Sequence, residues 1–187
     1  MALSKLQQMG LKMKILDDFL AEDDAALVSD ILHDQRFPWY YLDNISGYDG
    51  VSETFQYGFY HLLYHEPDGG VSSALFEHLA PLWQASDAAT GLTMYRARAG
   101  MSTNLGTPGV AHAHVDYKNP HTVVLYYLND SDGDTVIYDG DPDSGLTVVE
   151  RVPPKANRAV VFDGLRFHSS SYPTNCARRT VININYF

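Results

Sequence analysis

The chain has 187 residues and a formal net charge of −10, from 13 Lys and Arg against 23 Asp and Glu. This length suits a single domain, and 45% hydrophobic with 19% charged residues indicates a globular rather than a disordered chain. The acidic balance argues against a nucleic-acid or anionic-membrane partner, because phosphate binding needs clustered Lys and Arg. A single cysteine excludes an internal disulfide framework and any multi-cysteine metal site.

The beginning of the chain lacks the apolar core of a signal peptide, and no apolar run approaches the roughly 20 residues of a membrane helix. Cys176, as the lone cysteine, suits a reducing compartment. We therefore expect a cytoplasmic protein without a membrane partner. Nothing in the sequence specifies its oligomeric state.

Residues 1–91 are expected to form a mainly helical lead-in and support. Acidic residues at 22–24 precede apolar residues at helical spacing, which predicts a helix there. A second helix is expected over Ser72–Ala88, kinked or split by Pro81. The aromatic-rich stretch between the helices alternates loosely, which is compatible with strands.

Residues 92–187 have the texture of strands and turns. Short segments rich in β-branched and aromatic residues are separated by turn dipeptides such as Asp132-Gly133 and Asp163-Gly164. The expected strands are Leu92–Ala99, His112–Asp116, His121–Asn129, Asp134–Tyr138, Leu146–Val152, Arg158–Phe162, Phe167–Tyr172 and Thr180–Phe187. This spacing predicts a mainly β fold with N-terminal helices (α+β), in which helices buttress a sandwich or jelly roll.

The strongest chemical signal is His114-Val115-Asp116, followed much later by His168. Side chains two apart on a strand point to the same face, so His114 and Asp116 can converge on one metal ion, and another strand can bring His168 to it. Two imidazoles and one carboxylate leave the remaining positions of the ion open, as in the facial triad of non-haem Fe(II) oxygenases. Taken alone, His-x-Asp is more often a hydrogen-bonded surface pair.

Arg178 and Arg179 lead directly into the last expected strand, Thr180–Phe187, and lie about ten residues after His168. An arginine that points into a barrel beside a metal needs a buried anion, and a dicarboxylate cosubstrate supplies one that a guanidinium binds bidentately. Consecutive strand residues face opposite ways, so at least one of the two arginines should be exposed or paired with an acidic residue.

The stretch Ala99–Phe187 resembles the catalytic core of the Fe(II)/2-oxoglutarate-dependent dioxygenases, in particular the prolyl 4-hydroxylase-like branch of bacterial or phage type. The matching pieces, in family order, are His114-Val-Asp116, Tyr126-Tyr-Leu-Asn129, Asp132-Gly-Asp-Thr135, Phe162-Asp-Gly-Leu-Arg-Phe-His168 and the terminal arginine strand. The resemblance implies a double-stranded β-helix (jelly roll, cupin-like) and one oxygenase domain over 1–187, with 92–187 as the catalytic core.

The resemblance also implies roles for individual residues. His114, Asp116 and His168 would be the catalytic Fe(II) ligands, and Arg179 would bind the C5 carboxylate of 2-oxoglutarate. Tyr127 would be a second donor to that carboxylate, with a plain core tyrosine as the equal alternative. Asn183 shares the strand face of Arg179 and is a weaker candidate for the same pocket.

The implied activity is hydroxylation of an unactivated C–H, with 2-oxoglutarate and O2 consumed, succinate and CO2 released, and ascorbate as a candidate reductant. The branch points to a prolyl residue in a peptide or protein as substrate. The same chemistry on a small molecule or nucleotide is the first alternative. Two others are a three-histidine cupin enzyme using His112, His114 and His168, and a non-catalytic jelly-roll binding or structural protein.

Two further features lie near the expected site. Arg96 and Arg98 share a strand face, so either could reach the cosubstrate or substrate, although ion pairs with the acidic surface are the favoured interpretation. Arg98 is thus a weak candidate for cosubstrate binding. The Gly- and Pro-containing loop 104–110 precedes the ligand segment, and is either a lid or a simple connection.

Overall fold

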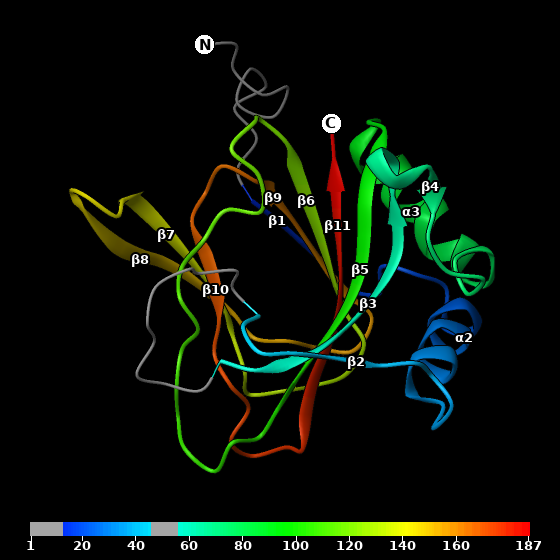
Figure 1. Cartoon of the computed structure of the whole chain (residues 1–187), viewed down its shortest axis with the longest axis horizontal. Coiled ribbons are helices and arrows are strands. Elements are labelled where there is room, and N and C mark those ends of the chain that lie inside the picture. The colour runs from blue at the N-terminus through cyan, green and yellow to red at the C-terminus, as the bar shows by residue number, and fades with distance from the viewer. Residues whose placement is uncertain (1–12, 46–55) are drawn as a thin grey trace.

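Two antiparallel β-sheets form the framework of the computed structural model, which describes residues 13–45 and 56–187 (Figure 1). The larger sheet has the strand order β1-β9-β6-β11-β5-β3-β2, with β4 paired to β3. Its strands are β1 (Lys14–Leu16), β2 (Tyr40–Leu42), β3 (Gly58–His65), β4 (Gly70–Val71), β5 (Met94–Thr103), β6 (Thr122–Tyr127), β9 (Arg158–Asp163) and β11 (Arg178–Tyr186). The smaller sheet has the order β10-β7-β8, from β7 (Thr135–Asp141), β8 (Gly145–Val152) and β10 (His168–Ser170).

Strand β6 shows why the two faces of the larger sheet differ. Val123, Leu125 and Tyr127 join a buried cluster that reaches the smaller sheet, whereas Val124 and Tyr126 join the core under the helices. Because successive strand side chains point to opposite faces, one strand that is buried along its whole length can serve two cores. The chain is therefore a mainly β jelly roll with helices on its outer face, which confirms the expected fold class.

Two α-helices cover the outer face of the larger sheet, away from the smaller sheet (Figure 1). They are α2 (Glu22–His33) and α3 (Ala80–Thr90), with 3-10 turns η1 (Glu66–Asp68) and η2 (Glu77–Leu79) between them. The helix expected over Ser72–Ala88 in fact begins at Ala80. Pro81 lies in its first turn, where a residue without an N–H is tolerated because the first N–H groups of a helix have no partner within it. None of the helices in the described ranges is long and apolar enough to cross a bilayer.

The expected mainly helical character of residues 1–91 is only partly correct. The two α-helices are present, but β1, β2, β3 and β4 also come from this region and belong to the larger sheet. Residues 58–65 form strand β3, which pairs with β5 over most of its length. Phe59 lies opposite Met101, and His65 lies opposite Arg96. The first half of the chain therefore supplies one wall of the jelly roll as well as its support.

The expected strand His112–Asp116 is also wrong. This segment makes only an isolated bridge, in which the backbone N–H groups of His114 and His168 each donate to the other residue's carbonyl at 2.9 Å. A continuous ladder is absent here, since the backbone N–H of His112, on one side of the bridge, donates to the side-chain oxygen Oε1 of Gln56 at 3.2 Å rather than to the carbonyl of a neighbouring strand. The single bridge is nevertheless enough to set the two histidines side by side.

Candidate metal centre and its pocket

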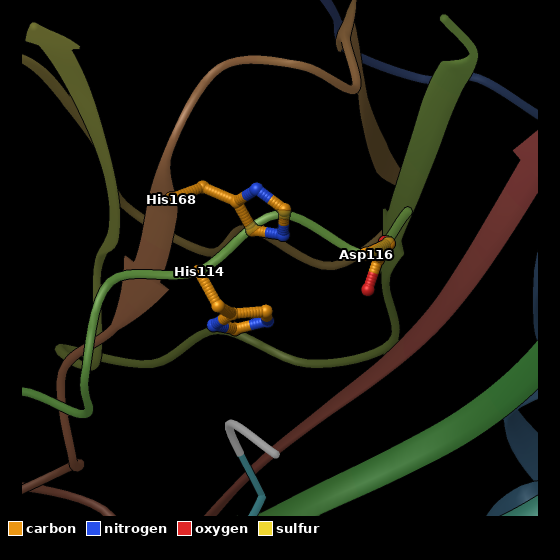
Figure 2. A group of neighbouring side chains, drawn as sticks. All are labelled: His114, Asp116 and His168. Atoms are coloured by element: carbon orange, nitrogen blue, oxygen red, sulfur yellow. The ribbon is translucent and has the colours of Figure 1, made fainter. Parts of the chain in front are cut away.

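His114, Asp116 and His168 converge between the two sheets. Their ligand atoms all lie within 4.8 Å of one another, and the two imidazole centroids are 4.7 Å apart. Figure 2 shows both rings and the carboxylate of Asp116 directed toward a shared space. The backbone bridge brings His168, on β10, beside His114, and the two-residue step along the chain brings Asp116 to the same side.

The backbone determines which ring nitrogen of each histidine can bind a metal. Nδ1 of His114 lies 3.1 Å from the carbonyl oxygen of His112, and Nδ1 of His168 lies 3.1 Å from that of Arg166. Because a carbonyl only accepts, each Nδ1 carries the proton and donates, which leaves the Nε2 lone pair for a metal. This is the tautomer that a pair of ligand histidines requires.

The carboxylate of Asp116 is held by three donors. Arg96 Nη2 lies 3.1 Å from Oδ1, while Asn183 Nδ2 and Asn185 Nδ2 lie 3.0 and 2.8 Å from Oδ2. Both amides come from β11, where Asn183 and Asn185 share one face of the strand. The interpretation of Arg96 as a partner of surface acids is therefore wrong, since its carboxylate partner is the candidate ligand.

Burial and charge hold two of these groups in the protonation states that metal binding needs. Burial lowers the pKa of His168 to about 4, so its imidazole is neutral near pH 7. Burial alone would raise the pKa of Asp116, but the charges of His168 and Arg96 and the hydrogen bond from Asn185 hold it well below its usual value. A neutral imidazole beside a carboxylate is a donor set that attracts a cation.

A pocket of about 100 Å³ opens from this centre. His114 and His168 line it, and the wall also includes Arg98, Thr135 and Arg179. Its remaining lining residues come from several strands and from the segment after β2, and are Leu42, Ile45, Phe59, Tyr60, Gly100, Met101, Ser102, Leu125, Ser169, Ser170, Val181 and Asn183. No residue of the described loop 104–110 is among them, so the lid hypothesis gains no support from the pocket lining.

Arg179 is buried, with 6% of its surface exposed, whereas its neighbour Arg178 is exposed. Its Nη2 donates to Thr135 Oγ1 at 2.7 Å, and Nε has no hydrogen-bond partner. No carboxylate of the described chain lies within ion-pair distance of it, and burial lowers its pKa. Its unpaired Nε–H is therefore free to donate to an anion that enters the pocket.

Thr135 is the pocket residue that sequence reasoning missed. Its hydroxyl lies 2.6 Å from the hydroxyl of Tyr127, and the ring of Tyr127 lies 5.6 Å from the Arg179 guanidinium carbon. Tyr127 is fully buried and does not itself line the pocket, so it acts on the pocket through Thr135 and Arg179. Thr135 belongs to the segment Asp132-Gly-Asp-Thr135, which resembles the family pattern, but no spacing rule connects it to Tyr127 and Arg179, which lie 8 and 44 positions away.

Gly133 makes room for the buried arginine. A Cβ at this position would lie 2.7 Å from the carbonyl oxygen of Ser171 and 3.1 Å from Cδ of Arg179. Any larger residue would therefore have to displace backbone or the aliphatic part of Arg179. Gly133 therefore helps to shape the end of the pocket that contains Thr135 and Arg179.

The other predicted candidates fall in two groups. Asn183 and Arg98 line the pocket, and the side-chain amide of Asn183 donates a hydrogen bond to the carboxylate of Asp116. His112 does not join the ligand cluster, and in the described part of the chain the group of three or more possible ligands is His114, Asp116 and His168. This geometry favours the facial triad over the three-histidine alternative.

Comparison with known families gives a match over residues 100–187 to the model described as the 2OG-Fe(II) oxygenase superfamily. Comparison with curated proteins gives no match. Among solved structures, a Trichoplax adhaerens prolyl hydroxylase in complex with a hypoxia inducible factor peptide fragment superposes with a TM-score of 0.67 and 16% identity. That match covers 97% of this chain and 86% of the other.

Two further structures share the fold. A Pseudomonas putida prolyl-4-hydroxylase matches with a TM-score of 0.58 and 18% identity, covering 93% of this chain and 91% of that one. HygX from Streptomyces hygroscopicus, solved with nickel and 2-oxoglutarate bound, matches with a TM-score of 0.61 and 14% identity, covering 99% and 87%. At these identities the likeness concerns the fold.

Proposed function

We propose that the chain, whose residues 100–187 match the model of the 2OG-Fe(II) oxygenase superfamily, is a member of that superfamily and hydroxylates an unactivated C–H of a prolyl residue in a peptide or protein. The enzyme is an oxidoreductase of the dioxygenase class, with Fe(II), 2-oxoglutarate and O2 as its cofactor and cosubstrates. Ascorbate is the proposed reductant. The neighbours that act on prolyl residues support the substrate, and the pocket of this chain supports the chemistry.

The observation that carries the proposal is a pocket with two different ends. A triad of two imidazoles and one carboxylate lies at one end, and a buried arginine without a carboxylate partner lies at the other. A dicarboxylate that also carries a keto group suits both ends at once, because one end can chelate a metal and the other can bind a guanidinium. A protein with only a structural role would have no need for this combination.

The residues present fit Fe(II) by the chemistry of their donors. His114 and His168 would offer Nε2, and Asp116 would offer a carboxylate oxygen, leaving open positions on the metal. When bound, the metal and 2-oxoglutarate supply the oxidising chemistry, with release of succinate and CO2. All other work is done by the backbone and side chains of the protein.

These groups orient the reactants. The carbonyls of His112 and Arg166 hold the two imidazoles in the metal-binding tautomer, and the donors around Asp116 hold its carboxylate in place. Arg179, supported by Thr135 and Tyr127, would bind the distal carboxylate of 2-oxoglutarate. Apolar residues such as Leu125 and Val181 line the wall between and limit the access of water.

We further propose that residues 1–187 act as a single oxygenase domain, with 92–187 as the catalytic core. Lining residues from β3 and from the segment after β2 support this, because the first half of the chain contributes to the same pocket as β11. A cytoplasmic location and a peptide, protein or small-molecule substrate remain predictions from the sequence.

Anaerobic titration with Fe(II) and 2-oxoglutarate tests the cosubstrate site. We expect a visible charge-transfer band in the wild-type protein, no band in His168→Ala, and a need for at least about tenfold more 2-oxoglutarate in Arg179→Ala. Iron binding without a band would favour the three-histidine alternative, and no iron binding would favour the non-catalytic jelly roll.

Turnover with prolyl peptides tests the substrate. We expect succinate release that depends on the peptide, and a gain of one oxygen atom on proline by mass spectrometry. Succinate released without peptide oxidation, together with a normal charge-transfer band, would retain the oxygenase and reject the prolyl substrate in favour of a small molecule or nucleotide.

A further inference from the structure

Arg98 is a second arginine in the pocket that lacks a carboxylate partner. It lies in the middle of β5, opposite Asn183 of β11 and Leu62 of β3, and its side chain lines the pocket. Within 13–45 and 56–187, no carboxylate lies within ion-pair distance of Arg98. Its neighbour on the same strand face, Arg96, instead has Asp116 as an ionic partner.

A purely structural role does not explain this placement. Burial lowers the pKa of Arg98, and the charge of Arg96 lowers it further. The charge of Asp116 acts in the opposite direction but is outweighed, because Asp116 forms its ion pair with Arg96 rather than with Arg98. A methionine or leucine would fill the same volume without that cost. The charge is therefore more readily explained by an anion that enters the pocket.

The cosubstrate in the proposed function does not supply that anion. Arg179 lies opposite Ser102, four positions along β5 from Arg98, which corresponds to about 13 Å of strand. In the proposed function Arg179 binds one carboxylate of 2-oxoglutarate and the metal binds the other, so each of the two negative charges already has a positive partner. Arg98 lies in register with Asn183, whose amide contacts Asp116, so it is close to the metal centre rather than to the distal end of the cosubstrate.

We propose that Arg98 binds a carboxylate of the substrate, so that the enzyme selects molecules with an acidic group close to the C–H that is oxidised. This inference rests on the proposed function and narrows its substrate class. Arg98 is then the specificity-determining residue, while the triad and Arg179 serve every turnover. The protein as a whole has a net charge of −10, so the positive charge inside the pocket attracts an anionic group to this site rather than to the surface.

Two sources could supply the carboxylate. One is the target residue itself, as in a free or C-terminal amino acid, and the other is an acidic side chain next to the target residue in a peptide. Both present the same chemistry to a guanidinium, which binds carboxylates in a planar two-point arrangement. N-acetyl-L-proline represents the first source, N-acetyl-aspartyl-prolinamide the second, and N-acetyl-L-prolinamide is the uncharged reference.

The test measures binding rather than turnover. Protein loaded with Zn(II) and 2-oxoglutarate is titrated calorimetrically with each of the three probes, in the wild type, Arg98→Met and Arg98→Lys. Arg178→Met is the matched control, because it removes an exposed arginine from the neighbouring strand. The affinity of each Zn(II)-loaded protein for 2-oxoglutarate alone is measured separately.

We expect the wild type to bind one carboxylate probe at least about tenfold more tightly than prolinamide. That preference should fall to within about twofold in Arg98→Met, persist in part in Arg98→Lys, and remain intact in Arg178→Met. The affinity for 2-oxoglutarate should change by less than about threefold in Arg98→Met. Which carboxylate probe wins identifies the source of the anion.

Several outcomes would overturn the inference. These are equal binding of charged and uncharged probes by the wild type, failure of both carboxylate probes to bind, or a preference that survives in Arg98→Met. A tenfold loss of 2-oxoglutarate affinity in Arg98→Met would reassign Arg98 to the cosubstrate. Failure of the wild type to bind 2-oxoglutarate would reject the proposed function itself, which the separate titration reveals.

Thermal unfolding of the protein without ligands gives a second measurement that needs no substrate. Arg98→Met should unfold at a temperature equal to or above that of the wild type, because it removes a charge that lacks a partner. A clear decrease would mean that Arg98 stabilises the fold and would contradict the inference.

Discussion

Arg96 and Asp116 form an ion pair inside the jelly roll, with 3.1 Å between Nη2 and Oδ1 and only 4% of the Asp116 side chain exposed. Arg96 is itself held in place, since its Nε donates to Asn185 Oδ1 at 3.0 Å and its guanidinium carbon lies 4.9 Å from the centre of the Tyr117 ring. Without a metal, Arg96 is the cation that balances the candidate ligand. Metal and arginine therefore neutralise the same carboxylate.

This relationship predicts the effect of Arg96→Met. The metal-free variant should lose about 3 kcal/mol of unfolding free energy, because Asp116 stays buried with only its amide donors. Zn(II) should make the loss smaller, since the metal compensates the same charge. Urea unfolding with and without Zn(II) measures both values.

The exposed pair Arg36–Asp34 provides the control for that measurement. Arg36→Met should leave the stability unchanged within the error of the measurement, with or without metal, because solvent screens the pair. An equal loss in Arg96→Met with and without Zn(II) would contradict the view that metal and arginine share Asp116.

The triad predicts which substitutions weaken metal binding. Asp116→Asn and His114→Gln should each reduce the affinity for Co(II) by at least about 100-fold, because each removes one of the three convergent donors. His112→Gln should leave the affinity within about threefold. A loss in His112→Gln as large as that in His114→Gln would restore the three-histidine site.

The arginine at the far end of the pocket predicts a graded series for 2-oxoglutarate. Arg179→Met should weaken binding to the Zn(II)-loaded protein by about 10- to 100-fold, as expected for the loss of a charge-assisted hydrogen bond. Thr135→Val should weaken it by about 3- to 10-fold, because Thr135 is the partner that orients Arg179. Calorimetric titration gives these values, and an unchanged affinity in Arg179→Met would refute the assignment.

Arg178→Met is the matched control for this series. It removes the same side chain one position earlier, where the strand points it to solvent, so the affinity for 2-oxoglutarate should stay at the wild-type value. A loss confined to Arg178→Met would mean that the two arginines have been assigned in the wrong order.

Two kinds of information in the sequence indicated the site. Alternation along the last strand indicated that Arg178 and Arg179 face opposite ways. The resemblance to the dioxygenase core singled out His168 as the third ligand and Arg179 as the inward arginine. The donors around Asp116 could not be predicted, because Arg96 and Asn185 lie 20 and 69 residues away from it. Which partner each arginine would meet depends on the register of β5 against β11, and residue patterns do not determine that register.

The same limit explains the errors in the fold. The local pattern in residues 58–65 allowed a strand, but only its pairing with β5 shows that the first half of the chain completes the larger sheet. His112–Asp116 has the composition of a strand, yet a strand requires a continuous partner, and here one bridge to His168 is formed. Long-range pairing, rather than local preference, decided both cases.

The low pKa of buried His168 predicts how the stability of the metal-free protein depends on pH. Its imidazole has a pKa of about 4 in the folded state against 6.5 in the unfolded state, so between these values only the unfolded chain takes up the proton. Stability contributed by this group is therefore complete above pH 6.5 and is lost as the pH falls toward 4. Between pH 7 and pH 5 the loss should be on the order of 2 kcal/mol.

Urea unfolding of the wild type, His168→Gln and His78→Gln at pH 7 and pH 5 tests this prediction. His168→Gln should lose less stability than the wild type over this range, because glutamine does not titrate. His78 is exposed, so His78→Gln should keep the wild-type dependence. Identical pH dependence in wild type and His168→Gln would show that burial does not hold this imidazole neutral, and would remove one reason for regarding it as a ready metal ligand.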